Sequence, residues 1–294
     1  MIAKLLLAGT ASVLLAGAAS AADLPRRAAP PPVFSPVPVF TWTGFYLGTH
    51  SSYAWSDNQT IRTTGNNGPG SGFTNTQLNV AQNRRPGTFR SEQDGIGNVG
   101  GGIGYNYQLT PGSGFVIGVN ADVTWTDISK SYAYFGPALA ANAGIPDPSN
   151  LRQRLDYLGT VQGRIGYAFD TVLVYGTGGF AYGNVNYGAN FFNGAGTLAY
   201  AGRYNDMETG YAYGGGIEWA IPTDSFLNRF NFIGSFIGAS AITLKAEYLH
   251  YDLGSRSVLV NATGLTAATG SYTSRFNTEG NLIKAGFNYK FGGL

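Results

Sequence analysis

The dominant pattern along the chain is an alternation of apolar and polar residues that begins near residue 42. Within 155–169, Val161 and Ile165 share one parity, whereas Gln162 and Arg164 share the other. Segments with this pattern are 45–55, 98–109, 115–126, 155–169, 210–221, 242–248 and 283–291. Because successive side chains of a strand point to opposite faces, each segment is predicted to be a β-strand with one apolar and one polar face.

An eighth strand is predicted over 172–186, but apolar residues fall on both of its parities, so its orientation stays open. Most of the predicted strands have about 11 to 16 residues, a length that suits a tilted crossing of a lipid bilayer better than a globular sheet. The connections alternate in length, as between the turns and loops of membrane barrels. Those at 109–114 and 170–171 are short, and those at 56–95, 128–153, 188–207 and 253–278 are long.

The connection 222–240 breaks this alternation, because it should be short and is long. Phe226, Phe230, Ile233 and Ile237 fall at helical spacing, which predicts a short amphipathic helix in the membrane interface. The alternative is that the two flanking strands extend into a hairpin. The sequence leaves both open.

The composition favours a β protein whose exterior is not water. Only 12% of residues are charged, about half the share of a soluble domain, and 44 are Gly. The 14% of aromatic residues excludes a disordered chain, and after residue 25 no apolar run is long enough for a membrane helix. In hydrocarbon only a closed sheet leaves no backbone edge unpaired. The predicted fold is an all-β, eight-stranded, antiparallel up-and-down transmembrane β-barrel, with the apolar parity towards lipid.

The N-terminus is predicted to direct export. Residues 1–21 have a basic Lys4, an apolar stretch and an Ala19-Ser20-Ala21 cleavage site, as in a signal peptide. The Pro-rich segment 22–40 is predicted to be an extended periplasmic tether, and 41–294 the barrel. We therefore expect an outer-membrane location with periplasmic N- and C-termini.

The polar parity carries equal numbers of acidic and basic residues. We hypothesise that they form an interior network of ion pairs and hydrogen bonds, comprising Asp122, Arg164, Glu218, Lys245, Glu247 and Lys284. Such a network is tolerated when complete, whereas an unpaired buried charge is strongly destabilising. Aromatic residues at strand ends predict interfacial girdles made of Trp42, Tyr53, Trp55, Trp125, Tyr167, Phe169, Trp219, Tyr289 and Phe291.

The sequence predicts no catalytic, cofactor-binding or metal-ligating residue. The chain has no Cys and only two His, His50 and His250, and it lacks a G-x-S-x-G motif. His50 has inward parity, and His250 lies near the loop end of its strand beside Asp252. The net charge of +2 gives no sign of nucleic-acid binding.

Several motifs, taken in order, resemble one known family. They are ASAADLP at 19–25, WTGFYLG at 42–48, YGTGGFAY at 175–182, GGGIEWA at 214–220, EYLHYDLG at 247–254 and GFNYKF at 286–291. The chain resembles the alphaproteobacterial outer-membrane immunogenic proteins, a porin-family branch related to the OmpA-like eight-stranded barrel. The resemblance implies a surface antigen with a structural role in the envelope, and pore activity is ascribed to some members.

The leading functional hypothesis is therefore a structural surface protein that presents extracellular loops and contributes to envelope integrity. The alternatives are a narrow small-solute pore, a barrel enzyme, and a soluble ligand-binding barrel. Expected partners are outer-membrane lipid, lipopolysaccharide and the barrel-assembly machinery during insertion. The loops, with Phe73, Tyr132, Tyr134, Phe135 and Tyr200, are candidate surfaces for an extracellular ligand or host partner.

Overall fold

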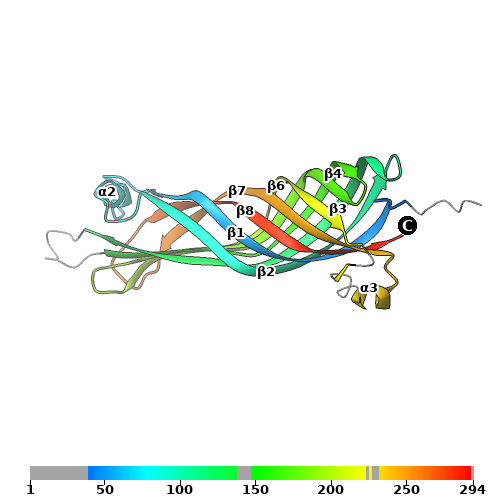
Figure 1. Cartoon of the computed structure of the whole chain (residues 1–294). Coiled ribbons are helices and arrows are strands. Elements are labelled where there is room, and N and C mark those ends of the chain that lie inside the picture. Colours follow the sequence, from blue (N-terminus) through cyan, green and yellow to red (C-terminus); the bar gives the residue numbers. More distant parts are fainter. Residues whose placement is uncertain (1–38, 138–146, 223–224, 227–231, 293–294) are drawn as a thin grey trace, which may run out of the picture. The chain divides into compact units, whose positions relative to one another are not determined.

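The computed structural model describes residues 39–137, 147–222, 225–226 and 232–292. Eight antiparallel strands form a closed barrel in which each strand pairs with its neighbours in sequence and β1 pairs with β8 (Figure 1). The strands are β1 (Gly44–Gly65), β2 (Thr88–Gln108), β3 (Ser113–Gly136), β4 (Asp147–Phe169), β5 (Val172–Phe192), β6 (Leu198–Ala220), β7 (Ala241–Ala262) and β8 (Ser271–Phe291). The predicted fold class is confirmed.

Two short helices lie at opposite ends of the barrel (Figure 1). Helix α2 (Thr76–Ala81) lies between β1 and β2, at what we call the loop end, and α3 (Phe232–Ile237) lies between β6 and β7, at the turn end. The turn end also holds the connections at 109–112 and 170–171, and the backbone N–H of Gly112 donates to the carbonyl of Phe40 there. In the part of the chain that the structure describes, no helix has the length and apolar character needed to cross a bilayer.

The strands are longer than the sequence predicts, and the predicted long loops are mostly strand. Each strand has 21 to 24 residues, and only 193–197 separates β5 from β6. A tilted strand of this length spans roughly 55 Å along the barrel axis, against about 30 Å for the hydrocarbon of a bilayer. A large part of the barrel, at the loop end, must therefore stand outside the membrane.

The half of the barrel near the turn end has an apolar outer surface. Phe45 is 67% exposed, and the same outward band includes Leu47, Val99, Ile103, Ile117, Val119, Val161, Ile165, Val174, Phe180, Ile217, Leu244 and Ile283. Outside β5, these residues follow the parity that the sequence assigns to lipid. The structure also orients β5, with Leu173 and Tyr175 inward and Val174 and Phe180 outward.

In the loop half, β-bulges reverse which parity faces inward. Leu155 is predicted to share the lipid-facing side of Val161, but it is only 2% exposed and lies inside the barrel. On β4, Leu155 pairs with Val185 and Tyr157 pairs with Asn184, so Asp156 is an extra residue. One extra residue moves every following side chain to the opposite face. Similar register shifts occur in β1 between Ser56 and Gln59, and in β7 between Asp252 and Ser255.

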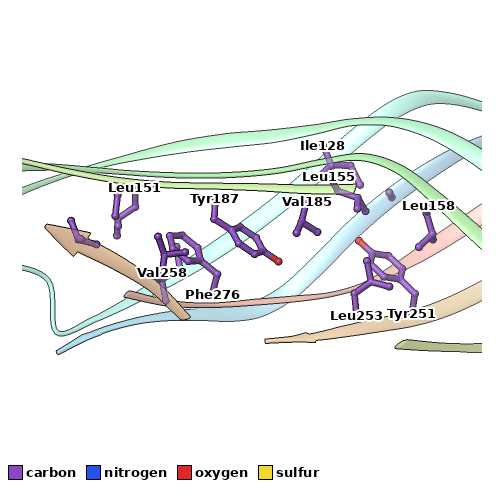
Figure 2. Close-up of a cluster of buried hydrophobic side chains, with 14 of the residues drawn as sticks. Ile128, Leu151, Leu155, Leu158, Val185, Tyr187, Tyr251, Leu253, Val258 and Phe276 are labelled. Carbon is purple, nitrogen blue, oxygen red and sulfur yellow. The ribbon is translucent and has the colours of Figure 1, made fainter. Parts of the chain in front are cut away.

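The interior of the loop half is a packed apolar core (Figure 2). The rings of Tyr187 and Phe276 stack at 4.8 Å, and Leu151, Val185 and Val258 pack around them. Tyr200, predicted to lie in an exposed loop, is 2% exposed and belongs to this core. The loop half is therefore built like a water-soluble barrel, whereas the turn half is built for lipid.

Three of the eight strand pairings are incomplete in the loop half, and in the β1–β8 ladder the gap lies between Trp55 and Arg62. The β2–β3 ladder ends at Val99 and Trp125, and the β6–β7 ladder is interrupted between Ala201 and Tyr211. Side chains bridge the β6–β7 gap, because Arg256 of β7 forms an ion pair with Glu208 of β6.

The connection from β6 to β7 contains a short helix rather than a hairpin. Strand β6 ends at Ala220 and β7 begins at Ala241, with α3 between them. Ile221 and Ile242 are buried with Tyr289 beneath this segment, while Phe236 of α3 is 92% exposed. Contact of α3 with the membrane interface stays a prediction. Phe230, the predicted signal peptide 1–21 and most of the tether 22–40 lie outside the described residues.

Candidate functional site

Five of the six predicted interior charges form a continuous chain of alternating sign across the lumen. Lys284 Nζ lies 2.7 Å from Asp122 Oδ1 and 3.9 Å from Glu247 Oε1. Arg164 continues the chain, with Nη2 at 3.9 Å from Glu247 Oε2 and Nη1 at 3.2 Å from Glu218 Oε2. These residues come from β3, β4, β6, β7 and β8, so the chain links five strands through the centre of the barrel.

The sixth predicted residue, Lys245, is buried but has no carboxylate within ion-pair distance among the described residues. It is the direct cross-strand neighbour of Glu218 in the β6–β7 ladder. With Lys245 included, three acidic and three basic groups balance, so the polar layer as a whole is electrically neutral.

Glycine on the inward parity makes room for these side chains. A Cβ atom at Gly104 would lie 2.3 Å from the hydroxyl oxygen of Tyr46, and one at Gly100 would lie 2.4 Å from Nε2 of His50. Both distances are far inside van der Waals contact. The Gly-rich polar parity is thus required by the narrow interior of an eight-stranded barrel.

Aromatic and amide side chains that the sequence did not single out complete the layer. The guanidinium carbon of Arg164 lies 3.9 Å from the ring centre of Tyr175 and 5.3 Å from that of Tyr46. The Tyr175 hydroxyl donates to Glu247, and the Asn288 amide donates to Glu218. The role of Tyr175 was hidden because the sequence could not orient β5.

His50 lies inside the barrel between a hydroxyl and a carboxylate. Its Nε2 is 3.0 Å from Thr124 Oγ1, and its Nδ1 is 3.4 Å from Asp122 Oδ2. Hydroxyl, imidazole and carboxylate in this order resemble a nucleophile triad. However, Thr124 is fully buried, and the adjoining cavity, bordered by Asp122 and Arg164, has about 10 Å³, which is room for one water and no substrate.

The second histidine lies on the outer surface and is separate from this layer. His250 Nδ1 is 3.0 Å from Asn281 Oδ1, and its ring lies 5.0 Å from the ring of Tyr213. Outside the gaps in the described chain, no group of three or more potential ligands is placed to hold a metal ion.

The predicted interfacial aromatics separate into an outer and a buried set. Outward-facing members are Tyr53, Trp55, Trp125, Tyr167 and Phe169, and Trp219 and Phe291 are half-buried beside the β6–β7 connection. Two residues correct the prediction. Tyr289 is 6% exposed, because that connection covers it. Trp42 is 1% exposed and lies inside the turn end, where its indole N–H donates to the carbonyl of Asp170 at 3.0 Å.

Three layers therefore fill the barrel along its axis. At the turn end, Trp42 packs with Val116, Leu173 and Ala220. The polar layer follows, and the apolar core fills the loop half. A lipid-facing apolar band around a closed, side-chain-filled, eight-stranded sheet defines the class of small outer-membrane β-barrels.

Comparison with known proteins identifies the family. Residues 9–291 match the profile of the outer membrane protein beta-barrel domain, and the chain belongs to this family. It is 28% identical to the 31 kDa outer-membrane immunogenic protein of Brucella melitensis biotype 1, over 98% of this chain and 100% of the relative. The protein of the same name from Brucella suis biovar 1 matches equally well. The resemblance found in the sequence motifs is confirmed.

Two solved outer-membrane proteins are similar to this chain at much lower identity. OprG of Pseudomonas aeruginosa is 11% identical, with a TM-score of 0.45 over 85% of this chain and 96% of its own. Neisserial surface protein A is 10% identical, with a TM-score of 0.33 over 85% of this chain and 98% of its own.

Proposed function

We propose that the protein is a structural surface protein of the outer membrane, whose closed barrel contributes to envelope integrity and does not conduct solutes. The observation that carries this proposal is the filling of the lumen by three successive layers. The cavity in the polar layer has about 10 Å³, and the core above it is apolar and tightly packed. A hydrated ion or a small solute would have to displace all three layers.

The proposed orientation places the turn end in the periplasm and the loop end outside the cell. Short periplasmic turns and longer external connections are the rule in bacterial barrels. The loop half, with its polar outer face and apolar core, is the part built to stand in water. It would hold the connections 66–87, 193–197 and 263–270 well above the lipid.

Planar-bilayer recording of the purified barrel tests the closed lumen. We expect no conductance steps above background, while a porin inserted in the same bilayer serves as the positive control. Reproducible unit steps that scale with protein concentration would instead support the narrow-pore alternative.

The proposed role in the envelope is tested in cells. Loss of the gene is expected to raise uptake of a hydrophobic dye, and expression of the full-length chain is expected to restore the barrier. Protease added to intact cells should cut within the loop-end connections and spare the turn end. Unchanged dye uptake in the deletion strain would count against a contribution to integrity.

The proposal assigns no catalysis to the buried His50 arrangement, since Thr124 is inaccessible to any substrate. Substitution of His50 by Gln should therefore leave every cellular phenotype of the wild-type gene intact. An outer-membrane hydrolase activity that disappears in this variant would contradict the assignment.

A further inference from the structure

A hollow of about 310 Å³ lies on the outer wall of the loop half, where β7, β8 and β1 meet. Its lining is formed by Thr60, Arg62, Ser255, Arg275, Phe276 and Asn277. Two arginines, two hydroxyls and one amide therefore surround a space that opens sideways from the barrel rather than upwards from the loops.

The two arginines lie on neighbouring strands without a counter-charge. Arg62 and Arg275 are direct cross-strand partners in the β1–β8 ladder, and both are exposed. Like charges in this relation are destabilising. Among the described residues, neither guanidinium lies within ion-pair distance of a carboxylate.

Two other arginines near the loop end are compensated by carboxylates. Arg256 donates from Nε and Nη2 to both oxygens of Glu208 at 2.7 and 2.9 Å, and Arg84 pairs with Asp147. By contrast, Arg275 donates from Nε and Nη2 to the hydroxyl of Ser255, at 3.0 and 2.6 Å. These bonds hold the guanidinium in place and leave its charge uncompensated.

The distance of the hollow from the membrane surface determines which anionic groups can reach it. Trp55 pairs with Asn281 at the level of the outer aromatic residues, and Arg275 lies six residues further along β8. With a tilted strand this distance is roughly 15 Å along the barrel axis. Polar headgroups extend only about 5 to 8 Å beyond the hydrocarbon, so an ordinary phospholipid would not reach the two guanidinium groups.

The nearest carboxylate along β8 does not neutralise the site. Glu279 is four residues from Arg275 towards the membrane, about 13 Å away at the rise of a strand. A net positive hollow therefore remains on the flank of the barrel, at the height of the saccharides that project from the outer leaflet.

We propose that this hollow binds the phosphate groups on the inner saccharide of lipopolysaccharide in the surrounding leaflet. The two guanidinium groups would take one phosphate between them by paired hydrogen bonds, and this anion would remove their mutual repulsion. Thr60, Ser255 and Asn277 offer hydroxyl and amide groups suited to the adjoining sugar. The inference rests on the proposed orientation of the barrel and is independent of whether the lumen conducts.

Calorimetry tests the proposal by measuring how a lipid-free, phosphorylated core oligosaccharide binds to the full-length barrel in detergent. The double variant Arg62→Gln/Arg275→Gln should bind at least tenfold more weakly than wild type. The matched variant Arg152→Gln, an exposed arginine on β4, should bind like wild type. Inorganic phosphate and the dephosphorylated oligosaccharide should both bind much more weakly than the phosphorylated form.

Urea unfolding of the ligand-free variants distinguishes a direct loss of binding from a loss caused by misfolding. The double variant removes the repulsion between two like charges, so without ligand it should be as stable as wild type or more stable. Arg275→Glu should stabilise the barrel by pairing with Arg62 while abolishing binding. Equal affinity of wild type and the double variant would overturn the proposal. Arginine-dependent binding of heparin without binding of the core oligosaccharide would overturn it in favour of a soluble glycan.

Discussion

Replacing Arg164 by Met removes the central cation of the polar layer. Its side chain is 1% exposed, contacts Glu218 at 3.2 Å and Glu247 at 3.9 Å, and lies over the ring of Tyr175. The variant leaves two carboxylates buried with one counter-charge fewer. Breaking a buried pair in this way costs about 3 to 5 kcal/mol of the free energy of unfolding. For a denaturant slope of about 2 to 3 kcal/mol per molar, the urea midpoint should fall by roughly 1 to 2.5 M.

The assay is urea unfolding of the refolded barrel in detergent, followed by tryptophan fluorescence and by heat-modifiable migration in gels. Arg152→Met, the same change at an exposed site on the same strand, should stay within about 0.5 kcal/mol of wild type. The double variant Arg164→Met/Glu218→Gln should recover part of the loss, because it restores neutrality. Wild-type stability of Arg164→Met, or strictly additive effects in the double variant, would refute the coupled network.

Three further results are expected. Gly104→Ala should lower the free energy of unfolding by about 1 to 3 kcal/mol, because the new Cβ would lie 2.3 Å from the hydroxyl oxygen of Tyr46. Gly163→Ala should be neutral in the same urea assay, because the nearest atom to its new Cβ would be 3.9 Å away. Leu155→Ala should lose about 2 to 5 kcal/mol, as for a core leucine, and a loss below about 0.5 kcal/mol would place this residue outside the core. Burial raises the pKa of Glu208, but hydrogen bonds from Arg256 outweigh burial and hold that pKa below its usual value. The ion pair therefore stabilises the β6–β7 gap fully at pH values above the unfolded-state pKa. This stabilisation is lost as the pH falls through the lower, folded-state pKa. Hydrogen exchange in 202–210 should therefore speed up, after correction for intrinsic rates, between pH 6 and pH 3, and equal protection at both values would contradict this sign.

The turn half of the barrel could be predicted from the sequence because its alternation is uninterrupted. Val161, Ile165 and Arg164 face as their parities predict, and the inward charges meet because a narrow barrel brings every inward side chain towards one axis. The same logic places His50 inside the barrel.

The loop half could not be predicted, because bulges change the phase of the pattern. The extra residue Asp156 moves Leu155 to the inside, and Gly254 takes a φ of +75° within the register shift of β7. A period-2 count across such a residue assigns the wrong face, and the polar outer residues of these strands then resemble loops. Trp42 is also not placed by the sequence alone, because a tryptophan at a strand end can belong to an outer girdle or to an interior cluster, and the structure shows the second.

The same strands turn their apolar side chains towards lipid in one half of the barrel and towards the interior in the other. Spin labels at single cysteines, compared for contact with oxygen and with a water-soluble relaxation agent in a bilayer, test it directly. A label at Ile165 should be accessible to oxygen in the acyl chains, and one at Arg152 should be accessible to the water-soluble agent. A label at Leu155 should be accessible to neither. Protein packing at Ile165, or acyl chains at Leu155, would contradict the account.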